Sequence, residues 1–124
     1  MSTLSPKGSQ DPIQDLRTKL RQFAAERDWD QFHSPKNLAM ALSVEAAELL
    51  EHFQWLSDTE SAALAPEKRA KIREELADVL LYLIRLADKL DIDLASAAAD
   101  KLSINAQKYP IQKARGSNKK YTEF

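Results

Sequence analysis

An apolar stripe between residues 72 and 90 constrains the fold more than any other feature of this chain. It consists of Ile72, Leu76, Val79, Leu83, Leu86 and Leu90. Steps of three and four residues place these side chains on one face of an α-helix, whereas the faces of a strand alternate at every second residue. A helix over residues 66–90 would have to bury this face against other helices. Because no segment shows strand-like alternation, we expect an all-α fold.

Three further helices are predicted over residues 11–28, 35–55 and 91–109. The first two begin with Asp11-Pro12 and Ser34-Pro35, in which a capping side chain precedes a proline suited to the first helical turn. Asp91 or Asp93 would cap the last helix. Only two glycines occur among 124 residues, which also favours helices. We expect a four-helix-bundle type of domain over residues 11–110, preceded by a flexible segment (1–10) and followed by a basic tail (111–124).

The composition limits the partners that the protein can have. A formal charge of −1 gives no overall attraction to a nucleic acid polymer or an anionic membrane. No apolar run approaches the roughly 18 residues that span a bilayer, and residues 1–10 lack the apolar core of a signal peptide. The absence of cysteine excludes disulfides and thiolate chemistry. We expect a cytoplasmic protein with neither a nucleic acid polymer nor a membrane as partner.

Two acidic pairs, Glu45/Glu48 and Glu75/Asp78, are the candidate chemical groups. Each pair has i,i+3 spacing, so its carboxylates share one helical face. Glu45 also lies in line with Leu38, Leu42, Leu49 and Phe53, where an unpaired charge is costly. If the two helices pack through their apolar stripes, the four carboxylates converge and need a cation. Mg²⁺ prefers oxygen ligands and often shares its coordination shell with substrate phosphates.

Two other interpretations of these carboxylates compete with a magnesium site. Acidic pairs on helices are commonly solvated, and Glu75 has Lys71 one turn before it. A di-iron bundle fits poorly, because the Glu-x-x-His motif of such proteins is missing. On the residues alone, His33 and His52 form no zinc site and are more typical of surface or capping groups. Pattern alone leaves the metal site and the solvated face as alternatives.

The ordered motifs of the chain resemble a known family. Glu45-Ala-Ala-Glu48 followed by Glu75-Leu-Ala-Asp78 is similar to the ExxE…ExxD signature of MazG-like, all-α nucleotide pyrophosphohydrolases. The segments that resemble the dCTP pyrophosphatase branch of that family are 23–33, 35–38, 53–55, 74–83, 101–105, 108–110 and 114–123. Together the likeness extends over about residues 16–123. ExxE alone is a weak signal, whereas this ordered set is specific.

The resemblance implies a reaction and a set of residues for it. A nucleoside triphosphate, dCTP or a modified dCTP, would be cleaved between the α and β phosphates to the monophosphate and pyrophosphate, as nucleotide-pool sanitation. Glu45, Glu48, Glu75 and Asp78 would hold Mg²⁺, or Mn²⁺ in its place, and Glu48 would activate the attacking water. The residues expected to bind substrate are Trp29, His33, Trp55, Tyr82, Lys101, Asn105, Lys108 and Tyr109.

Other functions stay open at this stage. Leu20 stands where the animal dCTP enzymes carry a histidine near the base pocket, which leaves dUTP or a broad range of nucleoside triphosphates as alternatives. A non-catalytic helical interaction module is a third possibility. Leu80, Leu81 and Ile84 extend the apolar surface beyond one stripe, so we expect a homo-oligomer, a dimer or a tetramer, that buries the excess.

Overall fold

The structure, a computed structural model, describes residues 11–124. These residues form six α-helices and two short 3₁₀-helices, with no strand among them. In chain order the elements are α2 (Pro12–Glu26), η1 (Asp30–Phe32), α3 (Pro35–Glu51), α4 (Asp58–Ser61), α5 (Pro66–Lys89), α6 (Leu94–Lys108), α7 (Ile111–Ala114) and η2 (Tyr121–Glu123). The prediction of an all-α fold is therefore confirmed, whereas the predicted flexible segment 1–10 lies outside the described residues.

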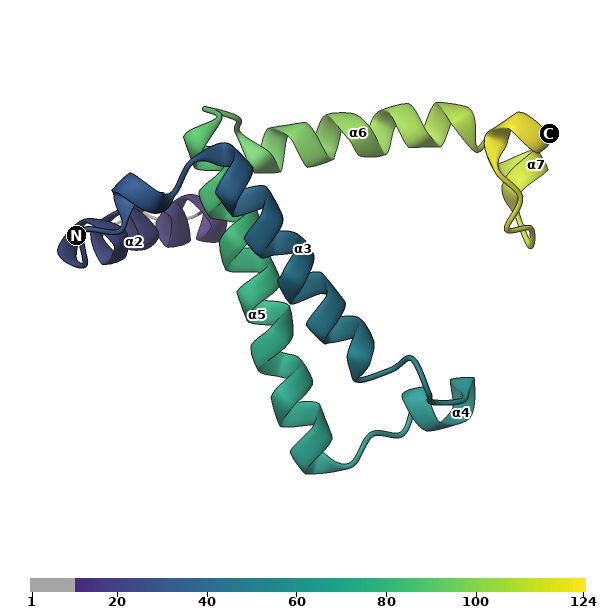
Figure 1. Cartoon of the computed structure of the whole chain (residues 1–124). Helices are drawn as coiled ribbons and strands as arrows, with labels where there is room; N and C mark the ends of the chain where they lie inside the picture. Colours follow the sequence, from purple (N-terminus) through teal and green to yellow (C-terminus); the bar gives the residue numbers. More distant parts are fainter. Residues whose placement is uncertain (1–10) are drawn as a thin grey trace, which may run out of the picture. The chain divides into compact units, whose positions relative to one another are not determined.

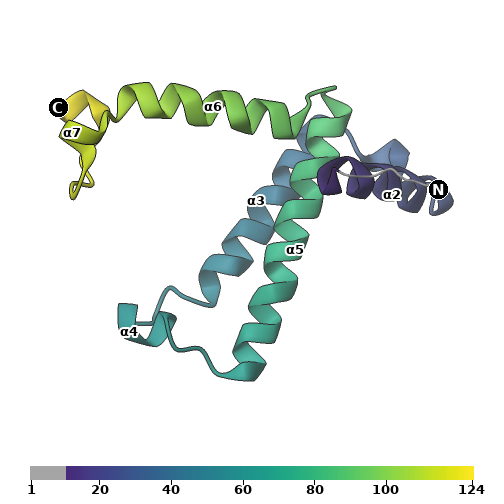
Figure 2. The same cartoon turned by 180° about the vertical axis from the view of Figure 1, so that it is seen from behind.

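The chain divides after Ile92 into two compact units. In the first unit α3 and α5 lie side by side and antiparallel, as both views show, and α2 packs against α5 (Figures 1 and 2). The connection from α3 to α5 passes through the short helix α4. Among residues 11–124 the buried apolar side chains are few, and all five belong to α2, α3 and α5: Ala24, Leu38, Ile72, Ile84 and Ala87.

The helices begin where the sequence places caps. The Asp11 carboxylate accepts from the Ile13 amide at 3.0 Å, and the Ser34 hydroxyl accepts from the Asn37 amide at 3.1 Å. Asp93, rather than Asp91, caps α6 by accepting from the Ser96 amide. Each of these bonds satisfies an amide that the helix itself leaves unpaired, which fixes the start of the helix locally.

Two helices end with an aspartate in the left-handed region. Asp28 has φ 53° and Asp91 has φ 55°, directly after the C-caps of α2 and α5. Beyond Asp91, the Ile92 amide donates to the Ala87 carbonyl at 2.9 Å, and the Asp91 amide donates to Asp88. This is the Schellman arrangement, in which glycine is the usual left-handed residue.

Two expectations about helix length and burial need correction. The second main helix ends at Glu51 instead of residue 55, because residues 52–56 form successive hydrogen-bonded turns that lead to the capping box of Ser57 and Glu60. Ile84 is not surplus apolar surface: its side chain is only 1% exposed, in the core of the first unit. The predicted stripe is also partly exposed, since Leu76 and Leu90 are about half-exposed.

The second unit contains α6, α7 and η2, and its end is held by aromatic contacts. The ring of Tyr109 packs edge-on against Tyr121 and Phe124, with centroids 6.0 and 5.8 Å apart. The Lys108 ammonium lies 4.7 Å from the Tyr121 ring centroid, a cation–π contact. The basic segment 111–124 thus folds back on the end of α6 within this unit. No described helix is long and apolar enough to cross a membrane.

Candidate active site

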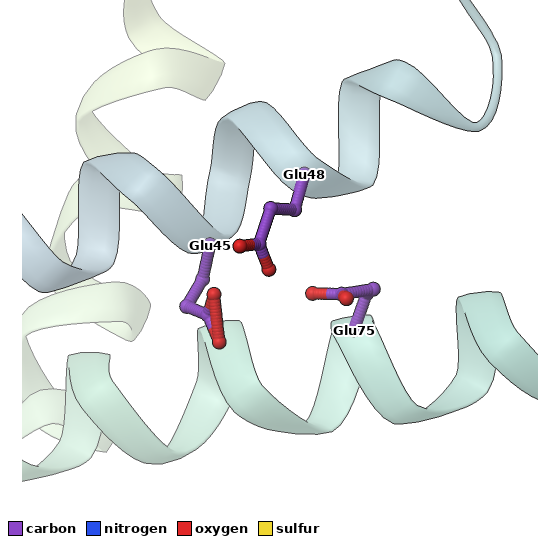
Figure 3. A group of neighbouring side chains, drawn as sticks. All are labelled: Glu45, Glu48 and Glu75. Carbon is purple, nitrogen blue, oxygen red and sulfur yellow. The ribbon is translucent and has the colours of Figure 1, made fainter.

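Three carboxylates from α3 and α5 meet in the first unit. Oxygen atoms of Glu45, Glu48 and Glu75 all lie within 4.8 Å of one another, and the three side chains are partly buried. Figure 3 shows the Glu48 carboxylate directed into the space between the helices, between those of Glu45 and Glu75. The cluster forms because antiparallel packing of α3 on α5 brings the two predicted acidic faces together.

The carboxylates raise the pKa values of one another. Hydrogen bonding with Glu48, loss of water, and the charges of Glu48, Glu75 and Asp78 raise the pKa of Glu45 to about 7. The pKa of Glu75 is also raised, first by desolvation and then by the charges of Glu48 and Asp78, while the nearby His52 acts in the opposite direction. Crowded carboxylates favour protonation because like charges repel in a medium less polar than water.

The donor set fits a hard divalent cation. One oxygen of Glu75, Oε2, is buried without a hydrogen-bond partner, an arrangement that is costly unless a cation or water satisfies it. Within residues 11–124, no Lys or Arg forms an ion pair with Glu45, Glu48 or Glu75. Oxygen-only ligands are those that Mg²⁺ and Mn²⁺ prefer. The solvated-face interpretation fits these half-buried groups less well.

Asp78, the fourth predicted carboxylate, lies beside the cluster and not within the group of three. It follows Glu75 by one turn of α5 and lines a pocket of about 340 Å³ in the first unit. Tyr82, one further turn along, lines the same pocket. The pocket and the carboxylate cluster are therefore adjacent, with Asp78 belonging to the pocket and acting electrostatically on Glu45 and Glu75.

The pocket wall is mainly apolar and aromatic. Trp29 and His33, both predicted to bind substrate, line it together with Leu20. The Trp29 ring packs edge-on against Phe23 at 5.7 Å and against His33 at 6.5 Å between centroids. The remaining lining residues are Leu16, Lys19, Phe23, Ala24, Leu38, Leu81 and Arg85. Such a wall suits a flat, partly apolar ligand with a few polar atoms.

Arg85 was not anticipated from the sequence, although it is the one charged residue buried in the described part of the chain. Its guanidinium donates to Asp30 at 2.6 Å and to the Nδ1 atom of His33 at 3.1 Å, and it lies 3.5 Å from Asp88. Arg85 follows Asp78 by seven residues, so helical spacing alone places both on one face of α5. That spacing was the available signal, but its partners Asp30 and His33 lie more than 50 residues away.

Trp55 is not among the residues of this pocket or cluster, and the predicted residues of α6 belong to the second unit. Trp55 follows α3 and is 86% exposed. In the second unit, Lys101, Asn105 and Lys108 share one face of α6 by their spacing of four and three residues. Tyr109 is the C-cap of that helix, and its ring belongs to the aromatic contacts described above. His52, expected to be a surface or capping group, is the C-cap residue of α3.

Comparison with known proteins identifies similar sequences over most of the chain. A sequence model described as the MazG-like family matches residues 40–124. The chain is 50% identical over 114 residues to dCTP pyrophosphatase 1 of Mus musculus and 48% identical to that of Homo sapiens. In both cases the match covers 90% of this chain and 67% of the relative.

A solved structure of a pyrophosphatase has a similar fold. The crystal structure of a pyrophosphatase from Archaeoglobus fulgidus superposes with a TM-score of 0.76 at 38% sequence identity. The superposition covers 86% of this chain and 99% of that one.

Proposed function

The chain belongs to the MazG-like family, and on this premise we propose that it is a dCTP pyrophosphohydrolase. The observation that carries the proposal is the cluster of Glu45, Glu48 and Glu75, without a cationic partner among the described residues, beside a pocket that contains Asp78 and Tyr82. The animal relatives named dCTP pyrophosphatase 1 support dCTP as substrate. These relatives also favour an enzyme over a non-catalytic interaction module.

In the proposed reaction a water oxygen attacks the α-phosphorus of dCTP. The bond between that phosphorus and the oxygen bridging to the β-phosphate breaks, which gives dCMP and pyrophosphate. Glu48 accepts the proton of the attacking water, a role supported by the position of its carboxylate between the other two (Figure 3). Trp29 and Tyr82 contact the base and sugar, since both line the pocket. Lys101, Asn105 and Lys108 of α6 are proposed as substrate-binding residues on the family resemblance alone.

Mg²⁺ is the proposed cofactor, with Mn²⁺ able to replace it. Glu45, Glu48, Glu75 and Asp78 would hold it, since all four supply oxygen and three of them already meet. When bound, the cation supplies neutralising charge and polarises the phosphate. The unsatisfied Oε2 atom of Glu75 supports this assignment.

A panel of nucleotides with Mg²⁺ or EDTA tests the function and the cofactor together. Pyrophosphate release should be fast with dCTP and 5-modified dCTP, and absent with EDTA. Glu48→Gln should lower kcat by at least about a hundredfold, as expected for a lost catalytic group, while the protein stays folded. The matched control is Glu51→Gln, an exposed glutamate at the end of the same helix. Equal activity of both variants, or turnover in EDTA, would contradict the proposal.

Leu20 favours a second substrate range. Its aliphatic side chain lines the pocket and cannot hydrogen-bond, so it gives no discrimination between the amino group of cytosine and the carbonyl of uracil. With no hydrogen-bonding side chain at position 20, turnover of dUTP is the second candidate activity. Turnover of dUTP within about tenfold of dCTP, which corresponds to about 1.4 kcal/mol in kcat/KM, would establish this broader specificity.

A further inference from the structure

We infer that Arg85 is a positioning residue that holds His33 as a neutral imidazole with its proton on Nε2, ready to donate to an acceptor atom of the nucleotide base. The inference rests on the proposed function, because it assigns to that pocket a polar contact with the substrate. Arg85 itself contacts protein groups through the hydrogen bonds described, and it acts on the ligand through His33.

The hydrogen bond between the two residues fixes the tautomer. Arg85 Nε donates to His33 Nδ1 at 3.1 Å. A guanidinium is always protonated and has only donors, so Nδ1 must be the unprotonated, accepting nitrogen. The single ring proton of a neutral His33 is then on Nε2. Within the described residues, Nε2 has no protein partner, and the His33 side chain lines the pocket.

The surroundings of Arg85 keep its guanidinium in place. Asp30 accepts from Nη2 at 2.6 Å, and Asp88 lies on its other side at 3.5 Å. Asp88 in turn accepts two hydrogen bonds from Arg21 of α2, at 2.5 and 2.8 Å. Lys89 reaches the same oxygen of Asp30 at 2.5 Å. The guanidinium is thus held from two sides, with its side chain 7% exposed.

The charges around His33 oppose its protonation. Desolvation and the positive charges of Arg85 and Lys89 lower the pKa of His33, against a smaller opposite effect of Asp30. A protonated ring would also place an N–H group against the Arg85 donor. His33 is therefore a neutral hydrogen-bond donor and not a second cation in the pocket, which suits an uncharged base better than a phosphate.

The tautomer can be measured directly by ¹⁵N–¹H NMR of the imidazole rings in the ligand-free protein near neutral pH. His33 should show a protonated Nε2 and an unprotonated Nδ1, and Arg85→Met should abolish this preference. Lys89→Met is the matched control, because it removes a charge that also acts on His33 but leaves the hydrogen bond from Arg85 to Nδ1 in place. It should therefore leave the tautomer unchanged. A proton on Nδ1, or a charged ring, in the unmodified protein would overturn the inference.

Kinetics with dCTP and Mg²⁺ test the contact with the base. Arg85→Met should raise KM about three- to tenfold with kcat within about twofold, the size expected for one neutral hydrogen bond. His33→Phe keeps the ring that packs on Trp29 but removes both nitrogens, and it should raise KM similarly. The double variant should be no worse than His33→Phe alone. Additive effects of the two changes would indicate a merely structural Arg85 and would overturn the inference.

Two further results keep this test decisive. If Arg85→Met does not fold, Arg85→Lys is used in its place. The lysine ammonium keeps the positive charge but cannot donate to Asp30 and His33 at the same time, as the guanidinium does. The same rise in KM is expected. If the folded wild-type protein hydrolyses no nucleoside triphosphate, the proposed function fails, and the contact with the base fails with it. The NMR measurement on the free protein still decides the tautomer, so the two failures are distinguishable.

Discussion

At the scale of single residues, Glu45 gives the protein an unusual pH dependence in the absence of metal. Its pKa is raised to about 7 in the folded state, against about 4.3 for a free glutamate. The folded state then binds the proton more tightly, so the stabilisation is fully present below about pH 4.3, decreases between the two pKa values and is lost once the pH has risen through 7. In EDTA, we expect the Tm to fall between pH 6.5 and 8.

His33 does not cause the expected fall in Tm between pH 6.5 and 8. Its pKa is lowered, so its contribution changes only below the ordinary histidine pKa of about 6.5. Glu45→Gln should make the fall in Tm in EDTA shallower, and the part that remains is assigned to Glu75, whose pKa is also raised. Millimolar Mg²⁺ should flatten the profile of the unmodified protein. A Tm that rises from pH 6.5 to 8 without metal would contradict the assignment of the raised pKa to Glu45.

Trp55 offers a second residue-scale prediction. Its side chain is 86% exposed, so Trp55→Ala should change the free energy of unfolding by less than about 0.5 kcal/mol. If Trp55 stacks on a base, the same change should raise KM more than it lowers kcat, because stacking contributes about 1–3 kcal/mol per base. Thermal unfolding and steady-state kinetics measure the two effects separately. A large loss of stability, or a loss confined to kcat, would assign Trp55 to the fold or to catalysis.

The carboxylates could be predicted from the sequence, whereas the role of Arg85 could not. Glu45 breaks an apolar stripe that is local in sequence, so its half-buried position follows from helical periodicity. The contacts of Arg85 depend on how η1 and the residue after it lie against α5, and this packing joins segments more than 50 residues apart. No local pattern encodes such a contact.

At the scale of elements, the backbone just after α5 has a strained conformation that a glycine would relieve. Asp91 has φ 55°, a region that costs a residue with a Cβ atom about 1 kcal/mol and suits glycine. Asp91→Gly should therefore raise the free energy of unfolding by about 0.5–1 kcal/mol, as measured by urea denaturation. Asp91→Ala is the matched control and should lower it. Both variants lose the attraction between Asp91 and Arg21 equally. The difference between their free energies of unfolding therefore measures the effect of the backbone conformation alone. Equal stabilities would contradict the prediction.

Helix starts were easier to predict than helix ends. Asp11, Ser34 and Asp93 cap their helices through bonds to amides two or three residues away, which makes the start of each helix a local property. The end of α3 at Glu51 depends instead on turns that lead to α4. The burial of Ile84 likewise depends on tertiary packing, which the periodicity of α5 alone does not specify.

At the scale of the whole molecule, the first unit leaves large apolar side chains uncovered. Met40, Val44 and Leu50 of α3 and Leu76 of α5 are 51–59% exposed, and Leu80 is 37% exposed. Because apolar surface of this kind favours association, we predict a dimer or tetramer by size-exclusion chromatography with light scattering. Leu80→Glu should shift the protein toward the monomer, whereas Ala70→Glu, an exposed position elsewhere on α5, should not. A monomer in the unmodified protein at micromolar concentration would contradict the prediction.

The different environments of the two tryptophans give the protein an internal optical probe. Trp29 packs edge-on against Phe23 and His33 at the pocket and is 45% exposed, while Trp55 is 86% exposed. With Trp55 replaced by phenylalanine, all indole fluorescence would arise from a single ring at the pocket wall. Titration with a nucleotide or a metal ion would then report local events by quenching or spectral shift without any label. The occupancy of the pocket could thus be followed in real time, independently of turnover.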